Sequence, residues 1–348
     1  MKIGRKQIGG TNPCYVIAEV AQAHDGSLGL AHSFIDAAAA AEVDAIKFQT
    51  HFAAAESSIY EPWRVKFSKQ DESRFDYWKR MEFTREQWVE LAEHARSKKL
   101  EFLSSPFSVE AVDLLEELQV AAYKIGSGEI TNPILLKRIG ETKKPVLIST
   151  GMSSWKEIDV AMETCQTLKL PVALFQCTTI YPTPLEKVGL NCLRELKDRY
   201  RVPVGLSDHS GEVEAGLAAV SLGANLLEVH ITFSKGMFGP DATSSITTED
   251  LKKLMKSIRR IETMLSHPVN KDAMAVELNE TKKNFSKSLV LTKAMQKGDK
   301  LTESCVSSRK PLRGIPSSDL HKVEGVRLLR DLPSGHFLNW DDLNMEER

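Results

Sequence analysis

Neither a long apolar run nor a strong net charge is found in this sequence of 348 residues. Its 46 Lys and Arg residues nearly balance 47 Asp and Glu residues, which leaves a net charge of −1 at pH 7. So small a charge gives no electrostatic reason to expect a nucleic acid or a membrane surface as partner. No stretch reaches the roughly 20 apolar residues that a membrane-spanning helix needs. We therefore expect a protein that binds neither nucleic acid nor membrane.

Cysteine is also scarce and irregularly placed. The five cysteines are an odd number without paired spacing, which argues against a disulfide framework and for a reducing compartment. The first residues, MKIGRKQIGGTNP, lack the apolar core of a secretory signal. Together these absences predict a cytoplasmic location.

What the sequence does contain is a repeated unit, an apolar run that ends abruptly in polar residues. It occurs eight times, at 15–19, 45–49, 101–106, 122–129, 146–151, 172–178, 205–210 and 226–232. Helical patterns separate these runs, at 28–41, 85–98, 109–118, 132–140, 155–168, 191–200, 213–222 and 248–265. Eight such units predict an α/β fold of the (β/α)8 or TIM-barrel type, with the polar run ends at one rim. A doubly wound parallel sheet is the alternative, but no glycine-rich phosphate loop follows the first run.

One connection, residues 50–83, is too long for a simple loop. It contains several aromatic and basic residues, which argue against disorder: Trp63, Arg64, Tyr77, Trp78, Lys79 and Arg80. Long connections in compact domains are often functional lids, and the alternative is a structural excursion that packs over one end of the barrel. The connection ends at Thr84, which with Gln87 has the spacing of a capping box.

The alternation of apolar runs and helical patterns ends after His267. We assign residues 1–267 to the barrel, 268–284 to a polar linker and 285–348 to a small β-rich domain. Short β-like runs in this last part are KSLVLT, KLTESCV, VRLLRDL and HFLNW. With about 60 residues, the domain is small enough to lean on the barrel or on a partner subunit for stability.

Two histidines, His209 and His230, stand at the ends of the seventh and eighth runs. A single histidine of this kind is more often a hydrogen-bonded core residue, but two on neighbouring strands can reach one ion. Without a pair of cysteines they do not form a closed zinc site. We expect an open divalent metal site that holds Mn2+ or Mg2+, with Co2+ and Zn2+ as alternatives.

Two lysines, Lys47 and Lys124, lie inside apolar runs. A buried lysine is rare unless it is paired, and a phosphate dianion is a suitable partner. Serines at four run ends and nearby glycines fit the same ligand: Ser105, Ser127, Ser149 and Ser207 with Gly126, Gly128 and Gly151. One alternative is a lysine Schiff base; another is that the lysines only pair with Glu19 and Glu129. Glu19 ends the first run, where it either neutralises the lysines or acts as a general acid/base.

The segments that carry these residues resemble those of the N-acetylneuraminate (sialic acid) synthase family. They are IAEVAQAHDG, DAIKFQT, FLSSPFS, YKIGSGE, LISTGMS, QCTTIYPTP, GLSDHS, EVHIT and MFGPDATSS, in the family's order. The C-terminal part resembles the family's antifreeze-like (SAF) domain. Nearly the whole chain is covered by this resemblance.

The resemblance implies a transferase that joins phosphoenolpyruvate to an N-acyl hexosamine and forms a nine-carbon 2-keto sugar acid and phosphate. It also implies a metal-dependent, domain-swapped homodimer, in which the SAF domain of one subunit covers the partner's barrel. The acceptor would be N-acetylmannosamine or a 6-deoxy diacetamido hexose. A lysine-dependent aldolase or lyase acting on a keto sugar acid is the alternative on the same fold, and a carbohydrate-binding protein ranks behind both.

Residue roles carried over from the resemblance follow the matching segments. His209 and His230 would hold the metal, and Glu19 would be the catalytic acid/base. The phosphoenolpyruvate site would consist of Lys47, Ser105, Lys124, Ser127, Ser149, Thr179 and Ser207. The sugar site would consist of Gln49, Glu129, Tyr181, Asp241 and, from the SAF domain, Lys310, with Arg309 and Arg313 as alternatives. Ala23 and Thr179 each replace an asparagine that is common in the family, which leaves the identity of the sugar open.

Overall fold

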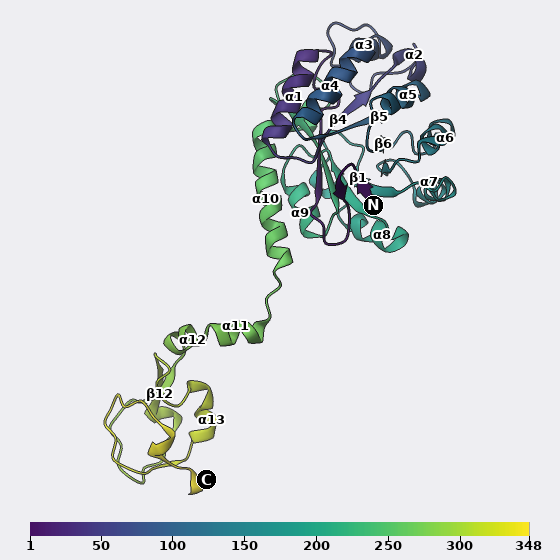
Figure 1. Cartoon of the computed structure of the whole chain (residues 1–348). Helices are drawn as coiled ribbons and strands as arrows, with labels where there is room; N and C mark the ends of the chain where they lie inside the picture. Colours follow the sequence, from purple (N-terminus) through teal and green to yellow (C-terminus); the bar gives the residue numbers. More distant parts are fainter. Residues whose placement is uncertain (348) are drawn as a thin grey trace. The chain divides into compact units, whose positions relative to one another are not determined.

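The computed structural model describes residues 1–347. The chain forms two compact units, a first from Met1 to Ser266 and a second that begins at His267 (Figure 1). Among the described residues, no helix is both long enough and apolar enough to cross a bilayer.

The first unit is a closed barrel of eight parallel strands. Each strand pairs with the next along the chain, and the last pairs with both its predecessor and the first, which closes the ring. The strands are β3 (Tyr15–Glu19), β4 (Ala45–Thr50), β5 (Glu101–Pro106), β6 (Tyr123–Ile125), β7 (Val146–Ser149), β8 (Val172–Cys177), β9 (Val204–Asp208) and β10 (Leu226–Thr232). A short strand, β11 (Ile246–Thr247), adds to β10. The predicted (β/α)8 barrel is confirmed, and the doubly wound sheet was wrong.

Eight helices lie around these strands (Figure 1). They are α1 (Leu28–Ala40), α4 (Arg85–Ser97), α5 (Val109–Glu117), α6 (Pro133–Thr142), α7 (Trp155–Thr167), α8 (Asn191–Tyr200), α9 (Glu214–Ser221) and α10 (Thr248–Ser266). Their buried faces and the outward-facing strand residues form one apolar core. The capping box at the start of α4 is confirmed, since Thr84 N donates to Gln87 and Gln87 N donates to Thr84 Oγ1.

The interior of the barrel is apolar at one end and polar at the other. Side chains two residues apart on a strand point to the same face, so each strand contributes to successive layers of this interior. Near the amino ends the interior is apolar and includes Ile17, Ala45, Leu103, Leu147 and Leu226. Two residues further along each of these strands stand Glu19, Lys47, Ser105, Ser149 and Glu228, all of them buried. The strand period therefore gathers polar groups in the carboxyl half of the barrel.

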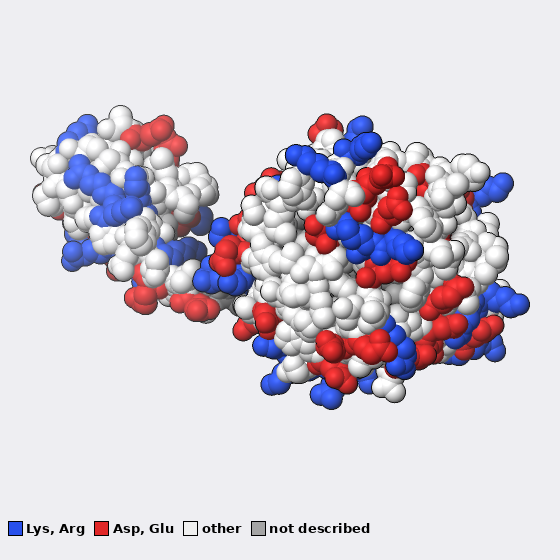
Figure 2. Space-filling model, turned by 90° about the horizontal axis from the view of Figure 1, so that it is seen from above, with Lys and Arg blue, Asp and Glu red and all other residues white. Residues whose placement is uncertain are grey.

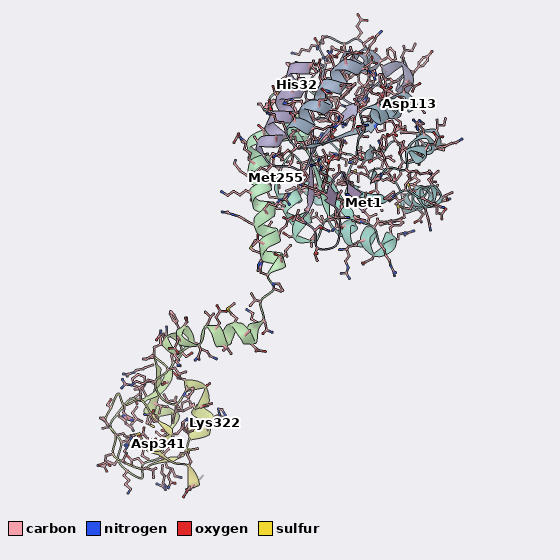
Figure 3. The ribbon with its side chains drawn as sticks, viewed as in Figure 1. Met1, His32, Asp113, Met255, Lys322 and Asp341 are labelled. Atoms are coloured by element: carbon pink, nitrogen blue, oxygen red, sulfur yellow. The ribbon has the colours of Figure 1, made fainter. Side chains whose placement is uncertain are left out.

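The apolar end is closed by a hairpin that the sequence did not predict. Strands β1 (Lys2–Ile3) and β2 (Lys6–Gln7) pair antiparallel. The buried side chains of Ile3 and Ile8 join the interior apolar layer, and Met1, labelled in Figure 3, packs against it. Water is thus kept from the amino end, and the chemistry is left to the other rim.

The long connection after β4 is an ordered insert. It contains α2 (Ala53–Glu56) and α3 (Arg74–Met81). Ala53, Tyr77, Trp78 and Met81 form a small buried cluster of their own. Arg80 ties the insert together and to the loop after β3, through ion pairs with Asp71 at 2.8 Å and Asp25 at 2.9 Å. Tyr77, Trp78 and Arg80 of this segment therefore have packing roles.

The second unit has its own apolar core. Its elements are α11 (Lys271–Glu277), α12 (Asn279–Phe285), β12 (Ser288–Leu291), β13 (Val306–Arg309), α13 (Leu320–Val323), β14 (Arg327–Leu328) and β15 (Leu343–Asn344). β12 pairs with β13 and β14 pairs with β15, both antiparallel. The 268–284 linker is largely helical. The HFLNW run meets β12 through an isolated antiparallel bridge between Phe337 and Val290 and forms no longer strand.

Candidate active site

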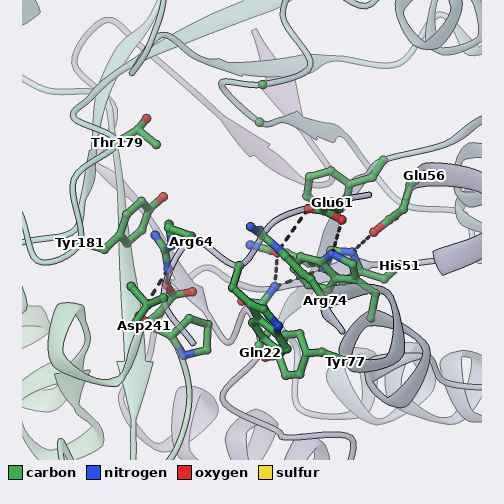
Figure 4. Close-up of a pocket in the computed structure, with 18 of the residues that line it drawn as sticks. Gln22, His51, Glu56, Glu61, Arg64, Arg74, Tyr77, Thr179, Tyr181 and Asp241 are labelled. Atoms are coloured by element: carbon green, nitrogen blue, oxygen red, sulfur yellow. Dashed lines mark hydrogen bonds and ion pairs between the residues drawn. The ribbon is translucent and has the colours of Figure 1, made fainter. Parts of the chain in front are cut away.

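A cavity of about 530 Å3 opens at the carboxyl ends of the barrel strands (Figure 4). Its floor is lined by residues at or just after β4, β6, β8 and β10, among them Gln49, Ser127, Thr179 and His230. The insert after β4 supplies much of its outer wall. This is the rim where the sequence placed its polar run ends.

A cluster of buried charges lies in the barrel interior, one strand step before the cavity floor. Lys47 Nζ is 2.5 Å from Glu19 Oε2 and 3.7 Å from Glu228 Oε1. Lys124 Nζ is 2.7 Å from Glu228 Oε1. The suggested pairing of Lys124 with Glu129 was wrong, since the carboxylate of Glu129 instead accepts a hydrogen bond from Asn132. Sequence reasoning missed Glu228, although its place two residues before His230 in LLEVHIT was an available signal.

The two carboxylates of this cluster differ in acidity. Burial raises the pKa of Glu19 well above its ordinary value, although Lys47 opposes this shift. Burial also acts against the charged form of Glu228, but Lys124 and Lys47 outweigh it and lower the pKa. Carboxylates whose environments separate their pKa values in this way suit different roles in acid–base chemistry. The pKa of Glu19 is therefore shifted toward neutral pH and that of Glu228 away from it.

Two of the four predicted serines contact the charged cluster directly. Lys47 Nζ donates to Ser105 Oγ at 3.1 Å, and Ser207 Oγ donates to Glu228 Oε1 at 3.2 Å. Ser127 Oγ accepts from the Gly151 amide at 3.0 Å, and Ser149 is buried at the end of β7. The Oγ1 atom of Thr179 is buried without a hydrogen-bond partner among the described residues. Hydroxyl groups and lysines thus converge from six strands or strand ends.

The two histidines meet beside this cluster. Their ring centroids are 5.0 Å apart, and the ring of Tyr181 lies 4.3 Å from that of His209. Burial lowers the pKa of both imidazoles to about 3, so they are neutral at pH 7. His209 Nδ1 lies 3.1 Å from the Thr178 carbonyl, which fixes the proton on Nδ1 and leaves the lone pair on Nε2.

These histidines fit a divalent metal ion. A neutral imidazole that donates its other N–H to a carbonyl is the usual form of a metal ligand. His230 Nδ1 is buried and makes no hydrogen bond within residues 1–347, with Asp241 Oδ2 at 3.8 Å. No group of three or more His, Cys, Asp or Glu residues suited to a metal occurs in the same range. Two protein ligands describe an open site, as expected for an ion that also contacts substrate.

The predicted sugar-site residues of the first unit line the cavity together with several that the sequence did not single out. Gln49, Glu129, Tyr181 and Asp241 are all in its wall. Figure 4 shows Tyr181, Arg64 and Asp241 on one side and His51, Glu56, Glu61 and Arg74 on the other. Lys310 belongs to the second unit, where its ammonium group lies 5.0 Å from the ring centroid of Phe285.

His51 was also missed, although it follows Gln49 at the end of the same strand. Its ring stacks on Trp78 at 4.2 Å and on Phe107 at 4.7 Å. Its Nδ1 is 2.6 Å from Glu56 Oε1 and its Nε2 is 3.2 Å from Gln49 Oε1. Gln49 Nε2 also donates to Glu19 Oε1 at 3.2 Å. Gln49 is therefore held between His51, which the insert positions, and the buried carboxylate of Glu19.

Known proteins are similar to this chain over nearly its full length. The diacetyllegionaminic acid synthase of Campylobacter jejuni is 36% identical over 306 residues, covering 86% of this chain and 91% of its own. The human N-acetylneuraminate-9-phosphate synthase is 30% identical and covers 98% of this chain and 94% of its own. The crystal structure of the sialic acid synthetase of Leptospira borgpetersenii, 31% identical, aligns with a TM-score of 0.71 over 82% of this chain and 96% of its own.

Two family models match the chain and divide it as the structure does. The SAF domain model matches residues 286–344, inside the second unit. The NeuB family model matches residues 34–270, which include all of the barrel except its first strand and part of its first helix. The match to more than half of the chain, at the barrel that carries the lysines, serines and histidines described above, shows that the protein belongs to the NeuB family.

Proposed function

We propose that the protein condenses phosphoenolpyruvate with an N-acyl hexosamine and releases a nine-carbon 2-keto sugar acid and phosphate. The observation that carries this proposal is the buried cluster of two lysines and three serines, Ser105, Ser149 and Ser207, directly beneath a sugar-sized cavity that Ser127 lines. A doubly charged ester with a carboxylate suits such a cluster, because ammonium and hydroxyl groups can donate hydrogen bonds to phosphate and carboxylate oxygens. The names of two relatives, a diacetyllegionaminic acid synthase and an N-acetylneuraminate-9-phosphate synthase, support the same assignment.

The lysines would bind and orient phosphoenolpyruvate. Lys47 and Lys124 bring two positive charges to a site where Ser105 contacts Lys47 and Ser207 contacts the carboxylate of Glu228. In a site closed to water on the hairpin side, fixed charges of this kind stabilise the charge that develops on phosphate as it leaves. Ser149 and the buried Thr179 hydroxyl complete the group of donors.

Glu19 would move the proton in the chemical step. Carbon–carbon bond formation at C3 of phosphoenolpyruvate leaves an electron-poor C2, which water attacks before phosphate departs. A carboxylate with a raised pKa is suited to take the proton of that water and to return it to the leaving group. Gln49 donates to Glu19 at 3.2 Å and so sets the orientation of its carboxylate.

His209 and His230 would hold a divalent ion, for which Mn2+ is our first choice and Mg2+ or Co2+ the next. When bound there, such an ion polarises the aldehyde of the acceptor sugar. The acceptor itself would be positioned by Gln49, Glu129, Tyr181 and Asp241 in the cavity wall.

We further propose a domain-swapped homodimer in the cytoplasm. All five cysteines are free, four of them buried, which suits a reducing compartment. In the second unit the residues Arg309, Lys310 and Arg313 are exposed, and Figure 2 shows Lys and Arg side chains gathered on a face of that unit. We assign Lys310 as the residue that reaches the sugar in the partner's barrel.

The test is phosphate release from phosphoenolpyruvate, measured with a panel of N-acyl hexosamines before and after treatment with EDTA. We expect release that depends on both the sugar and the metal and that returns when Mn2+ is added. Substrate that becomes attached covalently to the protein when borohydride reduces a lysine Schiff base, without phosphate release, would instead indicate the lysine-dependent aldolase. Full activity in excess EDTA after dialysis would remove the metal from the proposal.

A further inference from the structure

The carboxylate of Glu19 is held from two sides. Its Oε2 lies 2.5 Å from Lys47 Nζ, and its Oε1 accepts a hydrogen bond from Gln49 Nε2 at 3.2 Å. The two ends of an amide have nearly the same shape, so a reversed Gln49 would fit the same space. It would then present its carbonyl oxygen to the carboxylate, where two acceptors oppose each other. The groups that fix the Gln49 amide therefore also fix a contact of Glu19.

The carbonyl of Gln49 faces two buried side chains, Gln22 from the loop after β3 and His51. Gln22 Nε2 donates to Gln49 Oε1, and His51 Nε2 lies 3.2 Å from the same oxygen. The NH2 group of a reversed Gln49 could not accept from Gln22. Gln22 and His51 together thus favour the orientation in which the NH2 group of Gln49 points to Glu19.

The protonation of His51 is fixed at one nitrogen by Glu56. Nδ1 lies 2.6 Å from Glu56 Oε1, and because a carboxylate only accepts, Nδ1 carries a proton. On a neutral ring, Nε2 accepts from Gln22 Nε2 at 3.2 Å, and the same Gln22 amide bridges it to Gln49. On a protonated ring, Nε2 donates to Gln49 Oε1 directly. Both forms of the imidazole keep the carbonyl of Gln49 turned away from Glu19.

The ring of His51 is also clamped by its packing. It stacks on Trp78 of α3 at 4.2 Å and on Phe107 at 4.7 Å, the latter with an interplanar angle of 6°. The side chains of His51 and Glu56 are only 4% and 7% exposed, and Figure 4 shows Glu56 and Gln22 on either side of His51. A buried histidine paired with a carboxylate is often no more than a satisfied core residue. This one differs because its second nitrogen is directed at the floor of the cavity.

We propose that His51, held by Glu56, is a positioning residue for catalysis, which fixes the Gln49 amide in the orientation that donates to Glu19. This role rests on the function proposed above, in which Glu19 moves the proton. His51 acts through Gln49, so its loss slows the chemical step and leaves the binding of phosphoenolpyruvate largely intact.

The test measures phosphate release from phosphoenolpyruvate by the full chain, with an acceptor sugar from the panel. His51→Asn keeps an N–H near the position of Nδ1 but has no atom at the position of Nε2. We expect kcat to fall by roughly tenfold to a hundredfold, as for a buried polar group that loses its partner, with little change in the KM for phosphoenolpyruvate. His51→Gln can place an amide N–H near the position of Nε2 and should retain more of the wild-type kcat. An asparagine variant that is as active as the glutamine variant would overturn the role of Nε2.

A double-mutant cycle tests whether the effect passes through Gln49. Gln49→Met removes the amide, so adding His51→Asn to it should cause little further loss of kcat, because residues that act through one another are not additive. Glu56→Ala leaves the stacked ring in place, and its loss of kcat should disappear in the Gln49→Met chain as well. This second cycle decides the matter if His51→Asn does not fold. Equal losses with and without the Gln49 amide would overturn the positioning role.

His94→Asn is the matched control, since His94 also faces a carboxylate, Asp36 at 3.2 Å, but lies on α4 outside the cavity wall. It should keep the wild-type kcat. If the wild-type chain releases no phosphate with any sugar of the panel, the proposed function fails and the role of His51 with it. Wild-type turnover with additive losses in both cycles overturns the role of His51 alone.

Discussion

Glu19 and Glu228 share one buried cluster, yet only Glu19 has a pKa raised by its surroundings. Glu19→Gln keeps the shape of the side chain and removes its proton-exchanging group. General acid–base groups contribute roughly 100- to 10,000-fold to rate, so we expect kcat to fall within this range while both substrate affinities change little. Steady-state kinetics with each substrate varied in turn will measure the two effects separately.

The control for this substitution is Glu186→Gln, because Glu186 is exposed and outside the cavity wall. It should retain wild-type kinetics. If Glu19→Gln does so as well, Glu19 is only a counter-ion of Lys47 at 2.5 Å.

Lys124 allows a separate test of the phosphoenolpyruvate site. Lys124→Met keeps an unbranched side chain one atom shorter, removes the charge, and leaves Glu228 with Lys47 as its remaining cation, at 3.7 Å. Removing one partner of a buried charge pair costs about 3–5 kcal/mol. If about 3 kcal/mol of this appears in binding, the Kd for phosphoenolpyruvate rises on the order of a hundredfold, with little change in sugar affinity.

Calorimetric titration with phosphoenolpyruvate will check this expectation, with Lys156→Met on the exposed face of α7 as the control. A lower Tm with an unchanged Kd would show that Lys124 serves only to neutralise Glu228.

Single residues also show where sequence reasoning reached its limit. Glu19, Lys47 and Lys124 stand out because charged residues are rare inside apolar runs. The partner of Lys124 could not be chosen in the same way. Glu129 is near in sequence, but Glu228 is near in space, on β10 at the opposite side of the ring and four strands away from β6. Pairing across a closed barrel depends on register, which no local pattern contains.

At the scale of the element, the chain just after β7 is packed too tightly for a side chain at position 151. A Cβ on Gly151 would lie 2.4 Å from both Cys177 Sγ and Thr179 Oγ1 and 2.9 Å from Ser127 Oγ. Overpacking of this kind costs roughly 1–3 kcal/mol. Gly151→Ala should therefore push the ends of β6, β7 and β8 apart and raise the KM for phosphoenolpyruvate by roughly tenfold or more.

Gly29→Ala is the matched control, because its Cβ would meet nothing closer than Ser27 Oγ at 3.9 Å and alanine favours the helix that contains it. The Tm and the KM for phosphoenolpyruvate of both variants, from thermal unfolding and steady-state kinetics, will show whether only Gly151→Ala is affected. An unchanged KM for Gly151→Ala would mean that these three strand ends do not form the phosphate site.

Elements with a strong repeating pattern were the most predictable. The eight strands and their helices follow from periods of about two and 3.6 residues, and the start of α4 follows from Thr84 and Gln87. The N-terminal hairpin, the helices of the insert and the helical linker did not follow. Their stability comes from contacts such as that of Ile3 with the barrel interior and of Arg80 with Asp25, which join residues far apart in sequence.

At the scale of the whole molecule, the proposed dimer gives the C-terminal unit a catalytic role in its partner. This unit has its own apolar core and an exposed basic segment with Arg309, Lys310 and Arg313. A chain that ends after Ser266 keeps the complete barrel, because the two compact units divide there. We expect it to bind metal and phosphoenolpyruvate but to lose most of its turnover, since the sugar would lack its cover.

Mixing two inactive chains tests whether the cover comes from the partner. The full-length Glu19→Gln chain has an intact C-terminal unit and a disabled barrel, and the truncated chain has the reverse. A symmetric exchange in which each subunit covers the other predicts that a mixed dimer has one complete site, so activity should return when both chains are combined. Lys310→Ala in the full-length Glu19→Gln chain should reduce this recovery, whereas Lys322→Ala, on α13 of the same unit, should not. Mixtures that stay inactive, a truncated chain as active as the full one, or an active full chain that sediments as a monomer would each contradict the domain-swapped arrangement.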